Sequence, residues 1–226
     1  MQGMVIAVTG GFGVLGRAVI AAARAAGAEA AAIGRSAAPT TLDKGVLAIG
    51  QTDLVDPAAA ARAMAAVMAR FGRVDALINA AGAFRWQTLA DGPFESWAGL
   101  YAINVLTAAA ASKAALPHLV ASGGGAIVNV GAAAALRAGA GMGAYAAAKA
   151  GVHRLTEALA EEWKGKVRVN AILPSILDTP ANRADMPKAD PTAWVSTAEA
   201  AEVILFLASP RASAITGALL PVTGRV

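Results

Sequence analysis

The sequence predicts a doubly wound α/β fold, in which helices cover both faces of a parallel sheet of about seven strands. Short, continuously apolar segments alternate with longer helical ones, as expected for strands that are buried on both sides. A glycine-rich turn also follows the first strand and opens the first helix. At roughly 150 residues per domain, a chain of 226 residues without repeats or linkers favours a single domain, residues 1–226.

Seven segments are predicted as strands because they are short and apolar: Met4–Thr9, Glu29–Gly34, Val46–Gly50, Ala76–Asn79, Ala126–Val130, Val167–Ile172 and Ala218–Val222. Five longer segments are predicted as helices: Val14–Ala26, Pro57–Phe71, Ile103–Val120, Tyr145–Glu162 and Thr197–Ala208. Pro57 suits a first helical position, and Gly27 and Gly72 are typical C-terminal stops. Because strand and helix alternate, right-handed crossovers are expected to build one parallel sheet.

The composition excludes several classes of site. The chain has no cysteine, so it contains neither a disulfide framework nor a thiolate metal site. Its two histidines, His118 and His153, have no partners at ligand spacing, so both are predicted to be structural and no metal is expected. Lysine and arginine are scattered, although the net charge is +4, which argues against nucleic-acid binding.

The chain is predicted to be cytoplasmic, without a membrane span. Its N-terminus lacks the positively charged start of a signal peptide. The longest stretch without Asp, Glu, Lys or Arg, residues 114–136, is interrupted by Pro117 and three consecutive glycines, so it is not one membrane helix. Charged residues make up 15% of the chain. This share is below the usual ~25% and leaves few charges to cover a monomer, so self-association is predicted.

The glycine-rich turn is a predicted phosphate-binding site. Gly11, Gly13 and Gly16 match the pattern G-x-G-x-x-G between a strand and a helix. Glycine permits a tight turn and a close approach of the backbone to a pyrophosphate, which then lies at the helix N-terminus. This context favours a dinucleotide site over a glycine turn without a ligand. The expected contacts are Gly10, Gly11, Phe12, Gly13, Val14, Leu15 and Gly16.

The end of the second predicted strand indicates which dinucleotide binds. An acidic residue there would bind the ribose 2′-hydroxyl, but the chain has Arg35 and Ser36. A guanidinium pairs with a 2′-phosphate through two parallel hydrogen bonds. NADP(H) is therefore the preferred cofactor, with NAD(H) as the open alternative; the simpler interpretation is that Arg35 is a surface charge.

Tyr145 and Lys149 are four residues apart and are predicted to lie on one face of a helix. A nearby ammonium group is expected to lower the pKa of the phenol and to make Tyr145 a proton donor near neutral pH. Such a pair is common by itself, and an ordinary aromatic residue on a helix is the alternative. The dinucleotide motif favours the catalytic interpretation.

With these motifs, the chain resembles the short-chain dehydrogenase/reductase family over nearly its full length. Thr9–Gly16 resembles the family's glycine-rich loop, Tyr145 and Lys149 match its catalytic pair, and Asn104 matches the residue that holds a proton-relay water. Other positions that resemble the family's cofactor contacts are Asp53, Leu54, Asn79, Ala80, Ala81, Gly82, Pro174 and Thr179. The resemblance implies that Tyr145 and Lys149 also contact the cofactor, with Lys149 holding the nicotinamide ribose. The resemblance implies a Rossmann-type fold, an NAD(P)-dependent oxidoreductase with a small-molecule substrate, and a homodimer or homotetramer.

One departure from the family concerns its catalytic serine. The matching position is Ala132, and no serine or threonine occurs between residues 123 and 155. Losing a hydrogen-bond donor of this kind costs roughly 10²–10³ in rate. The substrate is therefore expected to be already electron-poor, such as a C=N or quinonoid group, which needs less polarisation.

The dihydropteridine reductase branch of the family resembles the chain here, because its serine position is also apolar. The local similarity is greatest in Leu177–Trp194, within residues 175–199, which contain several prolines, show little periodicity and are predicted to form a substrate loop. Arg35 departs from this branch, which favours NADH. Trp86 and Trp194 are further candidate substrate contacts, with packing as the alternative for each.

Three functions follow from these observations. The leading one is an NADPH-dependent reductase of an electron-poor substrate. The second is a general carbonyl reductase or alcohol dehydrogenase, in which a backbone amide near Gly131 or Ala132, or a water, replaces the serine. The third is a non-catalytic NADP-binding sensor or scaffold, against which the retained Tyr145, Lys149 and Asn104 argue.

Overall fold

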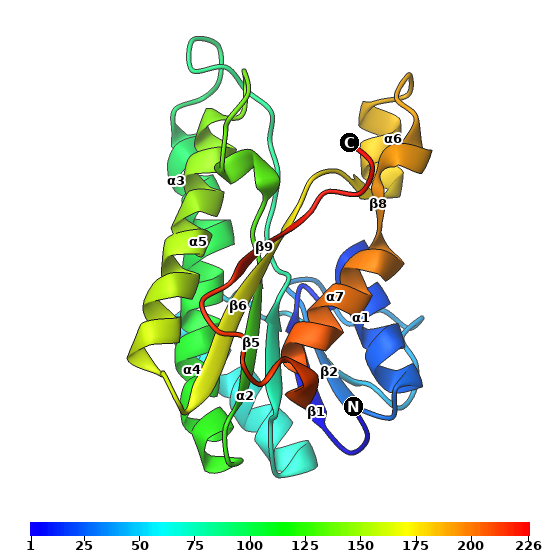
Figure 1. Cartoon of the computed structure of the whole chain (residues 1–226), viewed down its shortest axis with the longest axis vertical. Coiled ribbons are helices and arrows are strands. Elements are labelled where there is room, and N and C mark those ends of the chain that lie inside the picture. Colours follow the sequence, from blue (N-terminus) through cyan, green and yellow to red (C-terminus); the bar gives the residue numbers. More distant parts are fainter.

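The computed structural model describes all 226 residues and has the predicted architecture (Figure 1). Seven parallel strands form one sheet in the order β3-β2-β1-β4-β5-β6-β9. They are β1 (Val5–Thr9), β2 (Glu29–Ile33), β3 (Leu47–Ile49), β4 (Ala76–Asn79), β5 (Gly125–Val130), β6 (Val167–Pro174) and β9 (Leu219–Val222). The strand order reverses between β1 and β4. In sheets of this kind, ligands bind at the carboxyl ends of the strands beside that point.

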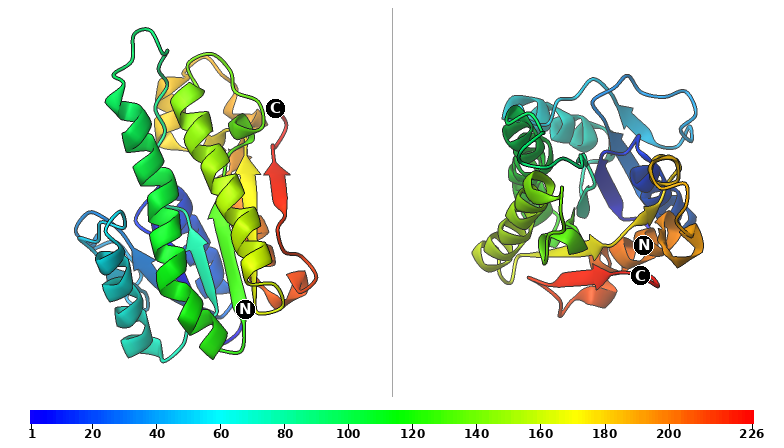
Figure 2. Two further views of the ribbon diagram at one scale, coloured as in Figure 1. Left: turned by 90° about the vertical axis from the view of Figure 1, so that its left-hand side faces the viewer. Right: turned by 90° about the horizontal axis from the view of Figure 1, so that it is seen from above.

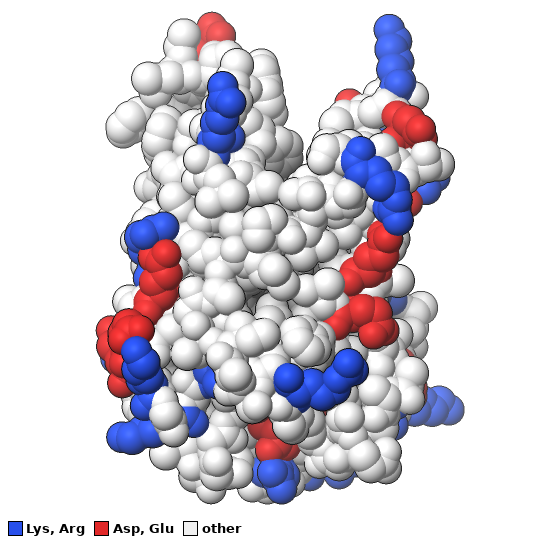
Figure 3. Space-filling view, in the orientation of Figure 1, with Lys and Arg blue, Asp and Glu red and all other residues white.

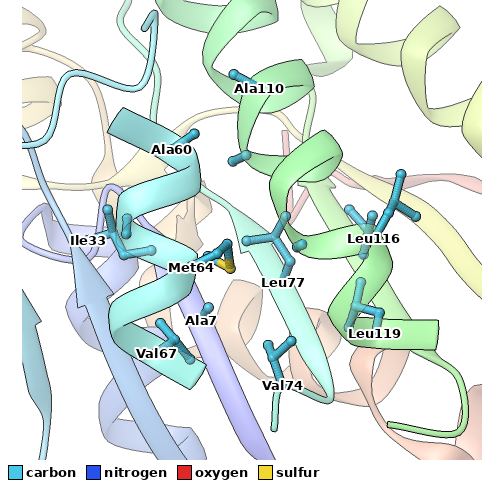
Figure 4. Close-up of a cluster of buried hydrophobic side chains, with 14 of the residues drawn as sticks. Ala7, Ile33, Ala60, Met64, Val67, Val74, Leu77, Ala110, Leu116 and Leu119 are labelled. Atoms are coloured by element: carbon cyan, nitrogen blue, oxygen red, sulfur yellow. The ribbon is translucent and has the colours of Figure 1, made fainter. Parts of the chain in front are cut away.

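Helices cover both faces of the sheet (Figures 1 and 2). One face carries α2 (Pro57–Phe71), α4 (Thr107–Ala121) and α5 (Gly143–Glu162), and the other carries α1 (Val14–Ala25) and α7 (Thr197–Ala208). The core on the first face contains many alanines together with Met64, Leu77 and Leu119. Figure 4 shows Met64 of α2 lying between Ile33 of β2 and Leu77 of β4. The small side chains let the helices lie close to the sheet.

The helix predicted from Ile103 begins earlier in the structure. It starts with α3 (Glu95–Tyr101), passes through a π-helical turn (Ala102–Leu106) and continues as α4. By length and composition alone, this 27-residue helix could cross a membrane, with a mean hydropathy of 1.2 over its most apolar window. However, 56% of that window is buried within the domain, which is typical of a core helix.

The segment 175–199 has more regular structure than its sequence predicted. β7 (Leu177–Asp178) pairs in parallel with β8 (Val195–Ser196), and α6 (Pro180–Asp185) and a 3-10 turn (Pro191–Ala193) lie between them. Each piece is too short to leave a periodic pattern in the sequence.

The C-terminal residues tie this segment to the domain. The Ser175 hydroxyl donates to the carbonyl of Thr223 at 2.7 Å, and the Arg225 amide donates to the carbonyl of Ala193 at 2.9 Å. The Arg225 guanidinium also donates to Glu199 at 2.8 Å. Together with two hydrogen bonds from Ser196, this contact lowers the pKa of Glu199 to about 2. Residues 223–225, which we call the C-terminal strap, thus hold both ends of the segment.

Candidate active site

The glycine-rich turn between β1 and α1 has the close contacts that a phosphate cradle needs. Gly10 has a φ of +66°, and a Cβ atom there would lie 2.8 Å from the backbone of Ala80 and Ala81. Gly13 is the N-cap of α1, and its cap has no side-chain hydrogen bond and no acidic residue in the first turn. The first amides of α1 are therefore available to an anion. The turn fits the pyrophosphate of a dinucleotide.

The residues after β2 leave one arginine without a partner. Arg35 and Ser36 are both exposed, and Arg35 forms no ion pair or hydrogen bond in this structure. A second arginine, which the sequence reasoning missed, lies on α1. Arg17 donates to the Phe12 carbonyl at 3.0 Å and to the Thr41 hydroxyl at 3.0 Å. It joins the cradle to the loop that follows β2.

The other predicted cofactor positions differ in what their side chains can offer. Leu54 is buried, while Asp53 is exposed and accepts from the Val55 amide at 3.1 Å. The Asn79 amide is buried and donates to Asn129 at 2.8 Å and to Ser112 at 3.1 Å. Its side chain is thus used inside the domain, and the backbone of residues 80–82 forms the edge beside Gly10.

Two predicted cofactor contacts lie beyond β6: Pro174 ends this strand, and Thr179 is the N-cap of α6. The hydroxyl oxygen of Thr179 accepts from the Asn182 amide at 3.2 Å. Asp178, beside it, forms a two-pronged ion pair with Arg183. Thr179 keeps a hydroxyl hydrogen to donate, whereas the Asp178 carboxylate is already paired.

Tyr145 and Lys149 lie on α5 as predicted. The Lys149 ammonium is buried and donates to the Val130 carbonyl at 2.7 Å. Its nitrogen lies 6.0 Å from the centroid of the Tyr145 ring. The opposite wall is Phe84, whose ring meets the Tyr145 ring edge to face at a centroid distance of 4.9 Å. Tyr145 thus lies between a cation and an aromatic ring.

The expected lowering of the pKa of Tyr145 is wrong for this arrangement. Burial raises the pKa of Tyr145 to about 12, and burial lowers the pKa of Lys149 to about 8. The ammonium bonds to Val130 rather than to the phenol oxygen, so its attraction does not offset the cost of burying a phenolate. Tyr145 is therefore a protonated donor at neutral pH, and Lys149 remains mainly charged.

Asn104 lies in the π-helical turn and is almost fully buried. Its amide donates to the carbonyls of Ala83 at 3.0 Å and Leu100 at 2.9 Å, and its oxygen accepts from the Ala83 amide at 3.3 Å. A Cβ atom on Gly82 would lie 2.6 Å from that oxygen, so only glycine fits there. The side chain anchors the loop after β4, and its relay-water role stays a prediction.

The position of the family serine is filled by the buried Ala132, in the turn that follows β5. The Gly131 amide donates to the Ile172 carbonyl at 2.9 Å. The Ala132 amide donates to Nε2 of His153 at 3.4 Å. The amides of Gly131 and Ala132 are therefore both bonded, whereas the next amide in the turn, that of Ala133, has no hydrogen bond and fits the predicted substitute donor near this position. The bond to His153 left no signal in the sequence, because its partner is a backbone group.

The two candidate tryptophans are placed differently. Trp86 is 60% exposed, its indole donates to the Ala140 carbonyl at 3.0 Å, and its ring covers Gly141, where a Cβ atom would overlap it. Trp194 is buried and packs inside the domain. Trp86 remains a candidate substrate contact, whereas Trp194 has the packing role that was its alternative.

The carboxyl ends of the strands point toward a hollow in the surface (Figures 1 and 3). In Figure 3, it opens at the upper end, between the projection formed by α3 and α5 and the projection that carries α6. Two exposed aromatic residues, Phe84 and Trp86, lie against Tyr145 and Gly141 near the start of α5.

Comparisons with known proteins agree with this geometry. The family model described as short chain dehydrogenase matches residues 4–190. D-threitol dehydrogenase of Mycolicibacterium smegmatis is 34% identical over 99% of this chain and 93% of its own, and galactitol 2-dehydrogenase (L-tagatose-forming) of Cereibacter sphaeroides is 35% identical over 99% and 95%.

Among solved structures, a short-chain type dehydrogenase/reductase from Mycobacterium ulcerans superposes with a TM-score of 0.92 at 27% identity, covering 100% of this chain and 90% of that one. A 3-ketoacyl-(acyl-carrier-protein) reductase from Brucella melitensis, complexed with NADH, has a TM-score of 0.87 at 28% identity over 99% and 98%.

Proposed function

The chain belongs to the short-chain dehydrogenase family and is an NAD(P)-dependent oxidoreductase, and on that basis we propose that it reduces a flat, electron-poor C=N or quinonoid substrate with NADPH. The observation that carries this proposal is the turn at Gly131–Ala132. It has no hydroxyl, and both of its amides are already bonded. Tyr145 is then the main polar donor to the reacting group, which suits a substrate that needs little polarisation.

The chain's own residues provide the remaining chemistry. Gly10–Gly16 hold the pyrophosphate, and Arg35 holds the 2′-phosphate. A nicotinamide bound there would supply the hydride for the reduction. The Tyr145 phenol gives its proton to the substrate nitrogen or oxygen, and the Lys149 ammonium favours the phenolate that results. Burial keeps the phenol protonated, which supports the direction of reduction.

The direct experiment follows nicotinamide absorbance with NADPH and NADH against quinonoid dihydropterin, cyclic imines, quinones and simple ketones. Turnover limited to the quinonoid and imine substrates is the expected result. Ketone turnover at a similar rate would instead favour the general carbonyl reductase or alcohol dehydrogenase, which the names of the relatives also favour. Binding of NADPH without turnover of any substrate would favour a sensor or scaffold.

The Ala132→Ser variant separates the first two functions. In a carbonyl reductase, the new hydroxyl would add a second donor and is expected to raise ketone turnover by about tenfold or more, given the ~10²–10³ value of such donors. For an electron-poor substrate, we expect no gain in kcat. The measurement is kcat for one ketone and one cyclic imine, with Ala133→Ser as the matched control one residue away. A tenfold gain on the ketone alone would contradict the leading function.

The Arg35→Glu variant tests the cofactor preference. Arg35 is exposed and unpaired, so its guanidinium is free for a 2′-phosphate, and a carboxylate would repel that phosphate and accept from a 2′-hydroxyl. We expect the Kd for NADPH to rise by about tenfold or more and the Kd for NADH to fall, as measured by fluorescence titration. Arg85→Glu is the charge-matched control. An unchanged NADPH preference would contradict the role of Arg35.

We also propose that the protein is a homodimer or homotetramer. A groove between α4 and α5, of about 280 Å³, is lined by Leu116, Pro117, Leu155, Leu159 and Trp163 among others. The low charge content of the chain supports the same proposal.

A further inference from the structure

We infer that His153 is a positioning residue of the candidate active site: its imidazole holds the Ala132 amide and thereby fixes the Gly131–Ala132 backbone beside Tyr145. From the sequence alone, His153 was predicted to be purely structural. The kinetic test of this inference rests on the proposed function, whereas its structural test needs no substrate.

The position of His153 on α5 connects it to the catalytic pair. It follows Lys149 by four residues and Tyr145 by eight, so the three side chains lie near one face of the helix. The imidazole is 1% exposed, and its Nε2 is the acceptor for the Ala132 amide at 3.4 Å. A buried histidine whose ring nitrogen accepts a backbone hydrogen bond orients that backbone as well as filling space.

Three side chains of α5 bond the end of β5 and the turn after it. The Thr156 hydroxyl accepts from the side-chain amide of Asn129 at 2.9 Å. Lys149 donates to the Val130 carbonyl at 2.7 Å, and His153 accepts from the backbone amide of Ala132. Lys149 and His153 therefore form hydrogen bonds with the backbone on either side of Gly131. Without the bond to His153, the bonds at Val130 and Gly131 remain, and the Ala132 amide is no longer held.

Gly131 leaves room for this imidazole because it has no Cβ atom. A Cβ atom there would lie 2.6 Å from Nε2 of His153 and 2.6 Å from Cδ2 of Leu173. Any larger residue would displace the ring or the turn. Gly131 and His153 therefore form a matched pair, as expected where a ring must reach the next amide.

The hydrogen bond fixes the protonation state of the ring. Since Nε2 accepts, the single proton of the neutral imidazole is on Nδ1. The charged groups that act on the ring are Lys149 and Arg154, both cations, and together with burial they lower the pKa of His153. On the side of β5 and β6, the ring faces the Gly131–Ala132 backbone, and Leu173 of β6 lies beside Gly131. The surroundings thus favour the neutral acceptor that the geometry requires.

The structural test uses ¹⁵N NMR of the imidazole nitrogens at neutral pH. The chain has two histidines, so a His118→Gln variant leaves a single set of signals from His153. We expect Nε2 to be unprotonated and Nδ1 to be protonated, as the acceptor role of Nε2 requires. A proton on Nε2 would overturn the inference.

The kinetic test compares His153→Leu, which removes the acceptor, with His153→Gln, whose amide oxygen reaches the place of Nε2. A small misplacement of a reacting wall costs catalysis more than binding, so His153→Leu is expected to lower kcat by about tenfold, while the Kd for NADPH stays within about twofold. His153→Gln is expected to recover most of kcat. Thermal unfolding of both variants shows whether each is folded at the assay temperature.

The outcomes separate the two proposals. If His153→Leu turns over within about twofold of the parent, or if His153→Gln is as impaired as His153→Leu, the positioning role is contradicted. If the parent itself reduces none of the substrates, the proposed function fails, and the protonation of Nε2 still decides whether His153 holds the Ala132 amide.

Discussion

Replacing Tyr145 by phenylalanine is expected to reduce kcat by roughly 10²–10⁴, the usual value of a positioned proton donor. The variant removes one oxygen and keeps the ring that meets Phe84 edge to face. The turn at Gly131–Ala132 offers no hydroxyl that could replace the lost donor. NADPH binding should be unchanged, because the cradle at Gly10–Gly16 belongs to other elements.

The measurement is kcat for the best substrate of the panel, with the Kd for NADPH as the binding readout. Tyr101→Phe is the matched control, since it removes the same atom from the chain's other tyrosine. Turnover of Tyr145→Phe within about tenfold of the parent would show that the proton comes from elsewhere.

Replacing Lys149 by methionine is expected to have opposite effects on stability and activity. Burial lowers the pKa of Lys149 from 10.5 to about 8, a difference that corresponds to about 3 kcal/mol of lost stability at pH 7. Methionine fills the space of the lysine stem without a charge. We expect Tm to rise by roughly 6–12 °C and kcat to fall by about 10²-fold. A lower Tm would show that the bond to Val130 outweighs the cost of burial.

The same pair gives a pH dependence of defined sign. The unfolded chain binds the Lys149 proton more tightly than the folded one, so the destabilisation is complete below about pH 8 and fades as the pH rises toward 10.5. The free energy of unfolding of the parent should therefore approach that of Lys149→Met over this window. Denaturant titrations at three pH values between 7 and 10 test this, below the range where Tyr145 ionises.

The sheet and the glycine-rich turn could be predicted from the sequence because they depend on local patterns. Apolar segments marked all seven strands, and the glycines marked a turn that tolerates no Cβ atom at Gly10. The start of α3 was missed because helix Glu95–Ala121 bends through a π-helical turn, which breaks the 3.6-residue period.

What the sequence could not show are the contacts between a side chain and a distant backbone group. The bond from Lys149 to Val130 and the bond from Ala132 to His153 each join α5 to the end of β5. The partner in each bond is a backbone carbonyl or amide, which every residue of this segment carries, so the sequence does not mark it. The predicted direction of the pKa shift of Tyr145 was wrong for the same reason. The shift depends on where the Lys149 ammonium bonds and on how deeply the phenol is buried.

The C-terminal strap has a consequence for the order in which the site is completed during synthesis. Residues 9–16 of the cradle leave the ribosome long before residues 223–225, but a domain generally folds as a unit. Segment 175–199 can be fixed only after Thr223 and Arg225 have been added. The side of the site that carries Thr179 is therefore expected to be completed only when residues 223–225 have emerged, late in synthesis.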